Sequence, residues 1–195
     1  MSIETTTRQP IPIGESDFRK IREAGKRYID KSLFIQDVIN ASAEVLLLPR
    51  PRRFGKTLNL SMLRYFFERC DENYGDLFND LTITQQKEFQ HHQGRYPVIY
   101  LSFKDLKDTS WEAVSRRLYR LIAAEIMRFE EIVTNAHVSV VDRNLFRHIL
   151  TGEATPDEYE DSLRLLSQYL CRHHDEKAVI LIDEYDAPIL SGYSD

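Results

Sequence analysis

Glycine, lysine and threonine follow one another at positions 55–57, after an apolar run and before a helical pattern. The ending Gly55-Lys56-Thr57 matches the P-loop pattern, which binds phosphate when it lies between a strand and a helix. Backbone N–H groups of such a loop surround the phosphate, and the N-terminus of the helix adds positive potential. We therefore expect a phosphate site formed by Arg53, Phe54, Gly55, Lys56, Thr57 and Leu58.

Three of these residues have separate expected roles. Gly55 lets the backbone approach the phosphate, because glycine has no Cβ atom. Lys56 would reach the β- and γ-phosphates and act in catalysis, and the Thr57 hydroxyl would ligate Mg²⁺. The loop has Arg50 where the usual pattern has its first glycine, so its prolines would supply the bend. A basic loop that caps a helix is the alternative interpretation.

Two carboxylates, Asp183 and Glu184, close the aliphatic run 178–182. Hydrophobic residues followed by Asp-Glu form the Walker B pattern, and the carboxyl ends of parallel strands form the ligand crevice of α/β sheets. Asp183 would hold Mg²⁺, and Glu184 would orient and deprotonate the attacking water as a catalytic base. The alternative is a plain strand end with solvated acids, and the role of Asp186 is open.

Apolar runs alternate with amphipathic helical patterns along the chain. The runs predict three strands that are buried on both faces: Val45–Leu48, Pro97–Phe103 and Ala178–Ile182. The helical patterns predict helices over 17–24, 31–40 and 110–131, and further helices that begin at Lys56 and after the N-cap Thr155. This alternation predicts a three-layer α/β fold, a P-loop NTPase-type parallel sheet flanked by helices. Gly55–Thr57 and Asp183 should then lie at the same edge of the sheet.

Other residue groups carry weaker signals. The adjacent pairs His91–His92 and His173–His174 are not expected to converge on one metal ion, because neighbouring side chains diverge on a helix or strand. The arginines between 116 and 120 favour a solvated helix face over a nucleic-acid site. Trp111 has core spacing on its predicted helix and is expected to pack inside the protein.

The chain of 195 residues is long enough for one domain with a sizeable core. Its net charge of −5 argues against whole-surface binding to nucleic acid or anionic membranes. Cys70 and Cys171 are too few for a disulfide framework, no secretory signal is visible, and the aliphatic runs are too short to span a bilayer. We predict a cytoplasmic protein with a flexible N-terminus over 1–10 and one P-loop domain over 11–195.

Three segments of the chain have counterparts in one known family. They are 12–32 with the strings Pro-Ile-Gly and Tyr-Ile-Asp-Lys-Ser, 50–63 with Arg-Pro-Arg-Arg-Phe-Gly-Lys-Thr, and Leu181–Asp186. With these segments the chain resembles, over nearly its whole length, the predicted AAA-ATPase-like family, whose members are mostly bacterial. The arginine-rich string is specific, so Arg50 in place of the first glycine is interpreted as the family's own loop chemistry.

The resemblance implies an additional-strand P-loop NTPase that binds ATP with Mg²⁺. It also implies that Tyr28–Ser32 packs near the nucleotide base, and that many such proteins carry a restriction-endonuclease-like nuclease domain downstream. In this fold a strand with a sensor residue follows the Walker B strand, and the sequence ends at Asp195, too soon for that strand. We therefore expect an incomplete, N-terminal part of an AAA-like ATPase domain, inactive by itself.

The predicted function is Mg-ATP binding, coupled to hydrolysis in the full-length protein and serving an unknown process. One alternative is a non-hydrolysing nucleotide-binding or protein-interaction module. Another is a kinase-like phosphotransferase in which Asp183 or Glu184 activates a hydroxyl group. ATP is the expected ligand, a protein partner or self-association stays open, and this segment indicates neither a membrane nor a nucleic-acid partner.

Overall fold

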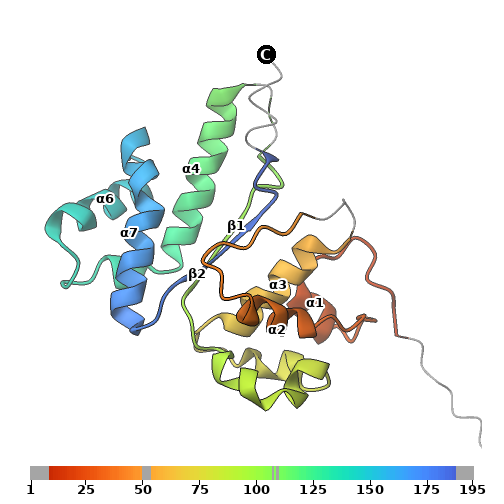
Figure 1. The fold of residues 1–195 in the computed structure, drawn as a ribbon. Helices are drawn as coiled ribbons and strands as arrows, with labels where there is room; N and C mark the ends of the chain where they lie inside the picture. Colours follow the sequence, from red (N-terminus) through yellow and green to blue (C-terminus); the bar gives the residue numbers. More distant parts are fainter. Residues whose placement is uncertain (1–8, 50–53, 107, 109, 188–195) are drawn as a thin grey trace, which may run out of the picture. The chain divides into compact units, whose positions relative to one another are not determined.

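The computed structural model describes residues 9–49, 54–106, 108 and 110–187 of the chain. The chain divides into two compact parts, an N-terminal part, Met1–Gly94, and a C-terminal part, Arg95–Asp195. Figure 1 shows helices in both parts and a small parallel sheet whose two strands belong to the C-terminal part. The protein is therefore of mixed α/β class.

The elements described in the N-terminal part are helical. They are α1 (Phe18–Glu23), α2 (Leu33–Asn40), α3 (Lys56–Phe67) and the 3₁₀ helices η1 (Tyr74–Phe78), η2 (Thr82–Gln85) and η3 (Lys87–His92). Phenylalanines form the centre of this part. Ring centroids lie 5.0 Å apart for Phe18 and Phe78, and 5.4 Å apart for Phe66 and Phe78. The helix predicted from Lys56 is confirmed as α3, and its buried face anchors it in this core.

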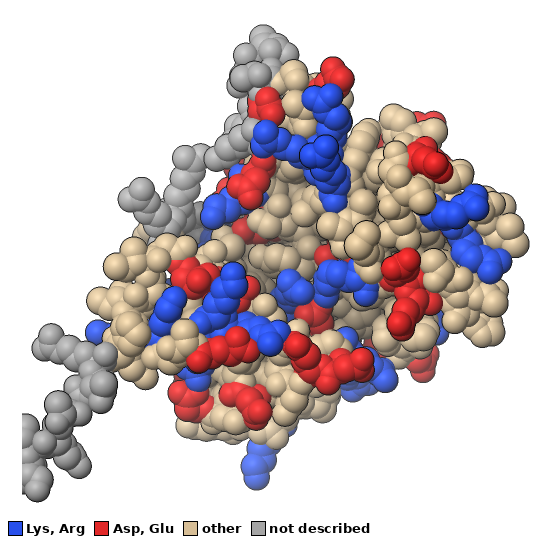
Figure 2. Space-filling model, turned by 180° about the vertical axis from the view of Figure 1, so that it is seen from behind, with Lys and Arg blue, Asp and Glu red and all other residues tan. Residues whose placement is uncertain are grey.

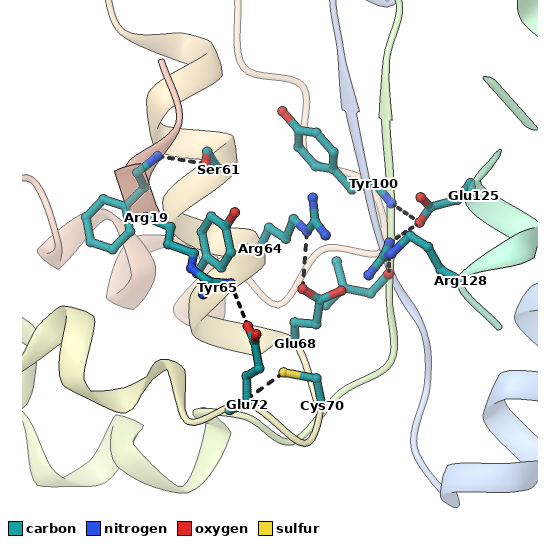
Figure 3. Close-up of polar contacts among 12 residues, drawn as sticks. Arg19, Ser61, Arg64, Tyr65, Glu68, Cys70, Glu72, Tyr100, Glu125 and Arg128 are labelled. Carbon is teal, nitrogen blue, oxygen red and sulfur yellow. Dashed lines mark hydrogen bonds and ion pairs between the residues drawn. The ribbon is translucent and has the colours of Figure 1, made fainter. Parts of the chain in front are cut away.

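Hydrogen bonds attach the start of α1 to α3. The Asp17 carboxylate caps α1 by accepting from the Lys20 N–H at 2.9 Å, and it also accepts from the Tyr65 hydroxyl at 3.2 Å. The buried Phe18 N–H donates to Ser61 Oγ at 2.9 Å (Figure 3). Because the first N–H groups of a helix have no acceptors inside the helix, these contacts stabilise α1 and fix it on α3.

The predicted strand Val45–Leu48 is wrong. The structure describes residues 45–49 without assigning them to a strand, and the Val45 side chain is 85% exposed. Pro49 favours extended backbone at Leu48 but supplies no N–H to a strand ladder. An extended apolar run becomes a strand only beside a partner strand, and the described residues of the N-terminal part contain none. Of the three predicted strands, two are therefore present.

The C-terminal part is built around those two strands. Its elements are β1 (Val98–Ser102), α4 (Trp111–Met127), α5 (Glu130–Val133), α6 (Val140–Thr151), α7 (Pro156–His174) and β2 (Val179–Asp183). The strands pair in parallel, from Val98 opposite Val179 to Ser102 opposite Asp183. Both strand predictions are confirmed, and the helices between the strands form the crossover that a parallel pair requires.

The core of the C-terminal part lies between β1 and the helices. Ile99 and Leu101 of β1 join one buried cluster with residues of the four helices α4–α7, which include Ile122, Ile126, Val133, Phe146, Leu166 and Leu170. α7 begins with a capping box formed by Thr155 and Glu158, which confirms the predicted helix start.

The helices differ from the predictions in three respects. The helix predicted over 110–131 is divided, because α4 ends at Met127 and α5 begins at Glu130. α6 has no predicted counterpart, since it starts with two exposed valines that obscure the helical spacing. Trp111 is 63% exposed rather than packed, because it is the first residue of α4 and the buried stripe begins at Val114.

Glu125 of α4 and Arg128, which follows the end of α4, hold the edge of β1 that faces away from β2 (Figure 3). The Tyr100 N–H donates to Glu125 Oε1 at 2.8 Å, and Arg128 Nη1 lies 2.5 Å from the same oxygen. Arg128 also donates to the Val98 carbonyl at 3.4 Å. Glu125 is only 6% exposed, and a carboxylate so buried is stable only with such partners. α4 therefore holds β1 at one position along the sheet.

Asp30 and Ser32 bind the segment Tyr28–Ser32 to η2. The Asp30 carboxylate accepts from the Thr82 N–H at 2.8 Å, from the Thr82 hydroxyl at 2.6 Å and from the Ser32 N–H at 2.8 Å. The buried Ser32 hydroxyl accepts from the Ile83 N–H at 3.1 Å. Burial raises the pKa of Asp30, but the hydrogen bonds from Thr82 and Ser32 outweigh it and lower the pKa to about 2.

Asp30→Asn should lower the melting temperature at pH 7 by about 2–4 °C, which corresponds to about 1 kcal/mol in a chain of this size. The asparagine amide has only one oxygen acceptor, and its NH₂ group is a donor, as are the N–H and hydroxyl of Thr82. Because the folded pKa lies below the unfolded value, the stabilisation is complete above about pH 5 and is lost as the pH falls toward 2. Thermal melts followed by circular dichroism should show the gap between variant and wild type narrowing below about pH 5.

Asp37→Asn changes an exposed carboxylate on α2 and is the matched control. Its melting temperature should equal that of the wild type at each pH. If the difference in melting temperature between Asp30→Asn and the wild type did not change with pH, the result would contradict the role of the ionised carboxylate.

Candidate functional site

α3 begins at a glycine whose conformation other residues rarely adopt. Gly55 has φ 76° and ψ 24°, in the left-handed region, and a Cβ atom built there would meet no atom of the described residues within 4 Å. Glycine is therefore required for its backbone conformation, since an L side chain would be strained here whatever the space. The same open space lets a phosphate approach this backbone.

The first turn of α3 is suited to an anion. Its first N–H groups have no acceptor within the helix, and Gly55 has no side chain that could cap them. Lys56 is the first helical residue and is half-buried, and no ion pair within the described part of the chain involves it. This first turn, which the structure describes in full, holds no acidic side chain. The positive end of the helix dipole and a lysine together attract negative charge.

The rest of the predicted phosphate loop is described in part. Phe54 is 59% exposed, and Thr57 and Leu58 are half-buried in the first turn of α3. Arg53 and Arg50 lie outside the described residues, so the predictions for them stay predictions.

Asp183 is the last residue of β2 and is 1% exposed. Its main-chain carbonyl accepts from the Phe103 N–H at 2.9 Å. Its Oδ2 atom lies 3.5 Å from the hydroxyl of Ser102, the residue opposite it in the register. The predicted metal ligand is thus a buried carboxylate at the carboxyl end of the sheet. Sequence analysis did not identify Ser102, because only the register of β1 on β2 places it beside Asp183.

The chain turns sharply after Asp183. Glu184 has φ 54°, in the left-handed region, and its carbonyl accepts from the Ala187 N–H at 2.9 Å to close a turn. Residues other than glycine rarely adopt this conformation, and such strain is concentrated at functional sites. The Glu184 side chain is half-buried and Asp186 is exposed. The two successive carboxylates therefore have different environments.

Each part of the chain carries its own share of the predicted site. Gly55, Lys56 and Thr57 meet at the start of α3 in the N-terminal part. Asp183 and Glu184 follow one another at the end of β2 in the C-terminal part. The placement of Lys56 and Asp183 at one edge of a common sheet stays a prediction.

Charges of both signs are interspersed over the surface. Lys and Arg side chains lie among Asp and Glu side chains on the face that Figure 2 shows. On α4, Arg116 pairs with Glu112 at 3.3 Å, and Arg117 pairs with Asp108 at 3.0 Å. These pairs partly neutralise the arginines between 116 and 120, which favours the solvated-face interpretation. None of the helices that the structure describes is both long and apolar enough to cross a membrane.

The backbone at Glu184 allows a test that needs no ligand. Glu184→Gly should be more stable than Glu184→Ala by about 1 kcal/mol in free energy of unfolding, because only glycine adopts this conformation without strain. Urea unfolding of both variants measures the difference.

The same two substitutions at Glu160, an exposed position within α7, are the matched control. There alanine should be the more stable by about 1 kcal/mol, because glycine is a poor helix former. If Glu184→Ala were also more stable than Glu184→Gly, the result would contradict the left-handed backbone at position 184.

Comparison with known proteins adds an independent finding. The sequence matches the profile of a family described as "Predicted AAA-ATPase" over residues 12–195. It is 27% identical over 200 residues to "Uncharacterized protein in vnfD 5'region" from Azotobacter chroococcum mcd 1. That alignment covers 95% of this chain and 31% of the relative, so the chain spans about a third of the length of that protein. No solved structure matches the chain significantly. Because the family profile covers both compact parts and nearly every residue, the chain belongs to the predicted AAA-ATPase family.

Proposed function

We propose that the chain binds ATP with Mg²⁺ as the nucleotide-binding unit of an AAA-like ATPase. The observation that carries this proposal is the start of α3, where a left-handed Gly55 with open space beside it precedes Lys56 and Thr57. A helix N-terminus of this kind favours phosphate, because its N–H groups and its dipole both attract the anion. Membership of the predicted AAA-ATPase family supports ATP as the nucleotide.

Oxygen donors on the chain suit a magnesium nucleotide. Mg²⁺ prefers oxygen ligands and is usually held by one or two protein groups together with the phosphates. The Thr57 hydroxyl and the Asp183 carboxylate are such groups, and we assign the metal to them. The phosphates are assigned to Lys56 and to the backbone N–H groups over 53–58. When bound, Mg²⁺ neutralises part of the charge on the phosphates.

The parallel pairing of β1 and β2 supports a P-loop NTPase-type fold for this unit. In such folds ligands bind at the carboxyl ends of the strands, which is where Asp183 ends β2. The burial of Asp183 also supports the assignment, since a carboxylate held in place can bind a metal without further ordering.

Glu184 is the proposed base in hydrolysis. A carboxylate that follows the metal ligand and is half-buried can accept a proton from a water molecule as that water attacks the γ-phosphorus. The bond between the γ-phosphorus and the β,γ-bridging oxygen breaks, ADP leaves, and the proton is held by Glu184. Lys56 donates hydrogen bonds to the terminal phosphates while negative charge shifts toward the leaving oxygen.

Lys56→Ala should weaken Mg-ATP binding by about 10-fold or more, since hydrogen bonds to charged groups contribute about 1.5–3 kcal/mol. Lys56→Arg should also bind less tightly, because a planar guanidinium does not replace a compact ammonium in a phosphate loop. Isothermal titration calorimetry measures both affinities.

Lys20→Ala removes an exposed lysine of α1 and is the matched control, for which the affinity should not change. Melting temperatures show whether each variant folds. Wild-type affinity in both folded Lys56 variants would overturn the assignment of the phosphate site to the start of α3.

Glu184→Gln should separate binding from chemistry in the intact protein. The amide keeps the size of the side chain but cannot accept a proton, so Mg-ATP affinity should persist while turnover falls by about 10²–10⁴-fold. Asp183→Asn should weaken Mg²⁺-dependent binding as well, because it removes the charge of a metal ligand. Calorimetry and phosphate release measure the two quantities. Tight binding without turnover in the wild-type intact protein would favour a non-hydrolysing nucleotide-binding module instead.

A further inference from the structure

Ser102 ends β1 directly beside Asp183. The parallel register places the two residues opposite each other, and the Ser102 hydroxyl donates to Asp183 Oδ2 across 3.5 Å. The next residue, Phe103, donates its N–H to the Asp183 carbonyl at 2.9 Å. β1 therefore contacts Asp183 twice, once through the main chain and once through a hydroxyl group aimed at the carboxylate.

We infer that Ser102 is a positioning residue for the Asp183 carboxylate. The inference rests on the proposed function, in which Asp183 ligates Mg²⁺. A hydroxyl that donates to one carboxylate oxygen restricts the rotation of the side chain and so favours one direction in which the carboxylate faces a metal ion. Such hydrogen-bond partners of metal ligands typically account for about 10–100-fold in metal affinity or activity.

The contact between Ser102 and Asp183 is long for a hydrogen bond. At 3.5 Å the two oxygens are farther apart than in a strong O–H···O hydrogen bond, so the contact contributes little to the free energy of folding. Asp183 is nevertheless buried, and a buried carboxylate depends on the donors that surround it. Loss of the Ser102 hydroxyl should thus alter how Asp183 is held without unfolding the protein.

The place of Ser102 along the sheet is itself fixed by α4. Two residues earlier, the Tyr100 N–H donates to the buried Glu125, which pairs with Arg128 (Figure 3). A shift of β1 by one residue would break this contact and turn every β1 side chain to the other face. Because the register cannot shift cheaply, the hydroxyl at position 102 stays beside Asp183.

The Mg²⁺ dependence of nucleotide binding tests this inference on the full chain. Ser102→Ala should raise the Mg²⁺ concentration for half-maximal binding of a fluorescent ATP analogue by about 10-fold. Binding of the analogue in EDTA and the melting temperature should not change. Ser102→Thr keeps the hydroxyl and should restore the wild-type Mg²⁺ dependence. Ser167→Ala removes a hydroxyl that donates to the Arg164 carbonyl at 2.8 Å in α7, and it is the matched control.

The outcomes separate the positioning role from the proposed function. A wild-type Mg²⁺ requirement in Ser102→Ala, with Lys56→Ala still weakening binding, would overturn the positioning role alone. A lower melting temperature with that requirement unchanged would make Ser102 a structural residue and overturn the role equally. If wild-type binding does not depend on Mg²⁺ and Lys56→Ala has no effect, the proposed function fails and the inference fails with it.

Discussion

The register of β1 on β2 is the constraint on which the C-terminal part depends. Side chains of a strand alternate between two faces, so a slip of one residue would exchange its buried and outer positions. The register observed here puts Ile99 and Leu101 in the core, and Glu125 of α4 holds the outer edge of β1 at Tyr100. The same pairing that buries the core therefore also sets the neighbour of Asp183.

In the N-terminal part a helix, rather than a sheet, holds the proposed site residue Lys56 in position. One face of α3 is buried among phenylalanines, and the contact of Phe18 with Ser61 fixes α1 on it. Because these contacts lie along the body of α3, they hold the helix that carries Lys56 as its first residue. Binding residues on a rigid element keep their geometry better than residues on a loop, which suits the proposed role of Lys56.

Elements with local signals could be predicted from the sequence, and elements that depend on distant partners could not. α7 begins with its capping box at Thr155, α3 begins directly after Gly55, and β2 ends at Asp183, as expected, although the strand expected before Gly55 is absent. Val45–Leu48 has the composition of a strand, but a strand also needs a partner, which composition does not supply. Ser102 could not be identified for the same reason, since its neighbour is 81 residues away in the sequence. The joint placement of Lys56 and Asp183 is a long-range property of this kind.

The adjacent carboxylates of the proposed site need different surroundings, and the backbone supplies them within one residue. A metal ligand benefits from a carboxylate that is held in place, and that of Asp183 is buried beside the Ser102 hydroxyl. A base that takes a proton from water must instead be reachable by water. Had β2 continued, Glu184 would have pointed to the opposite face from Asp183, because successive side chains of a strand alternate. The left-handed backbone at Glu184 ends the strand at this point, so the strain there has a reason in the proposed chemistry.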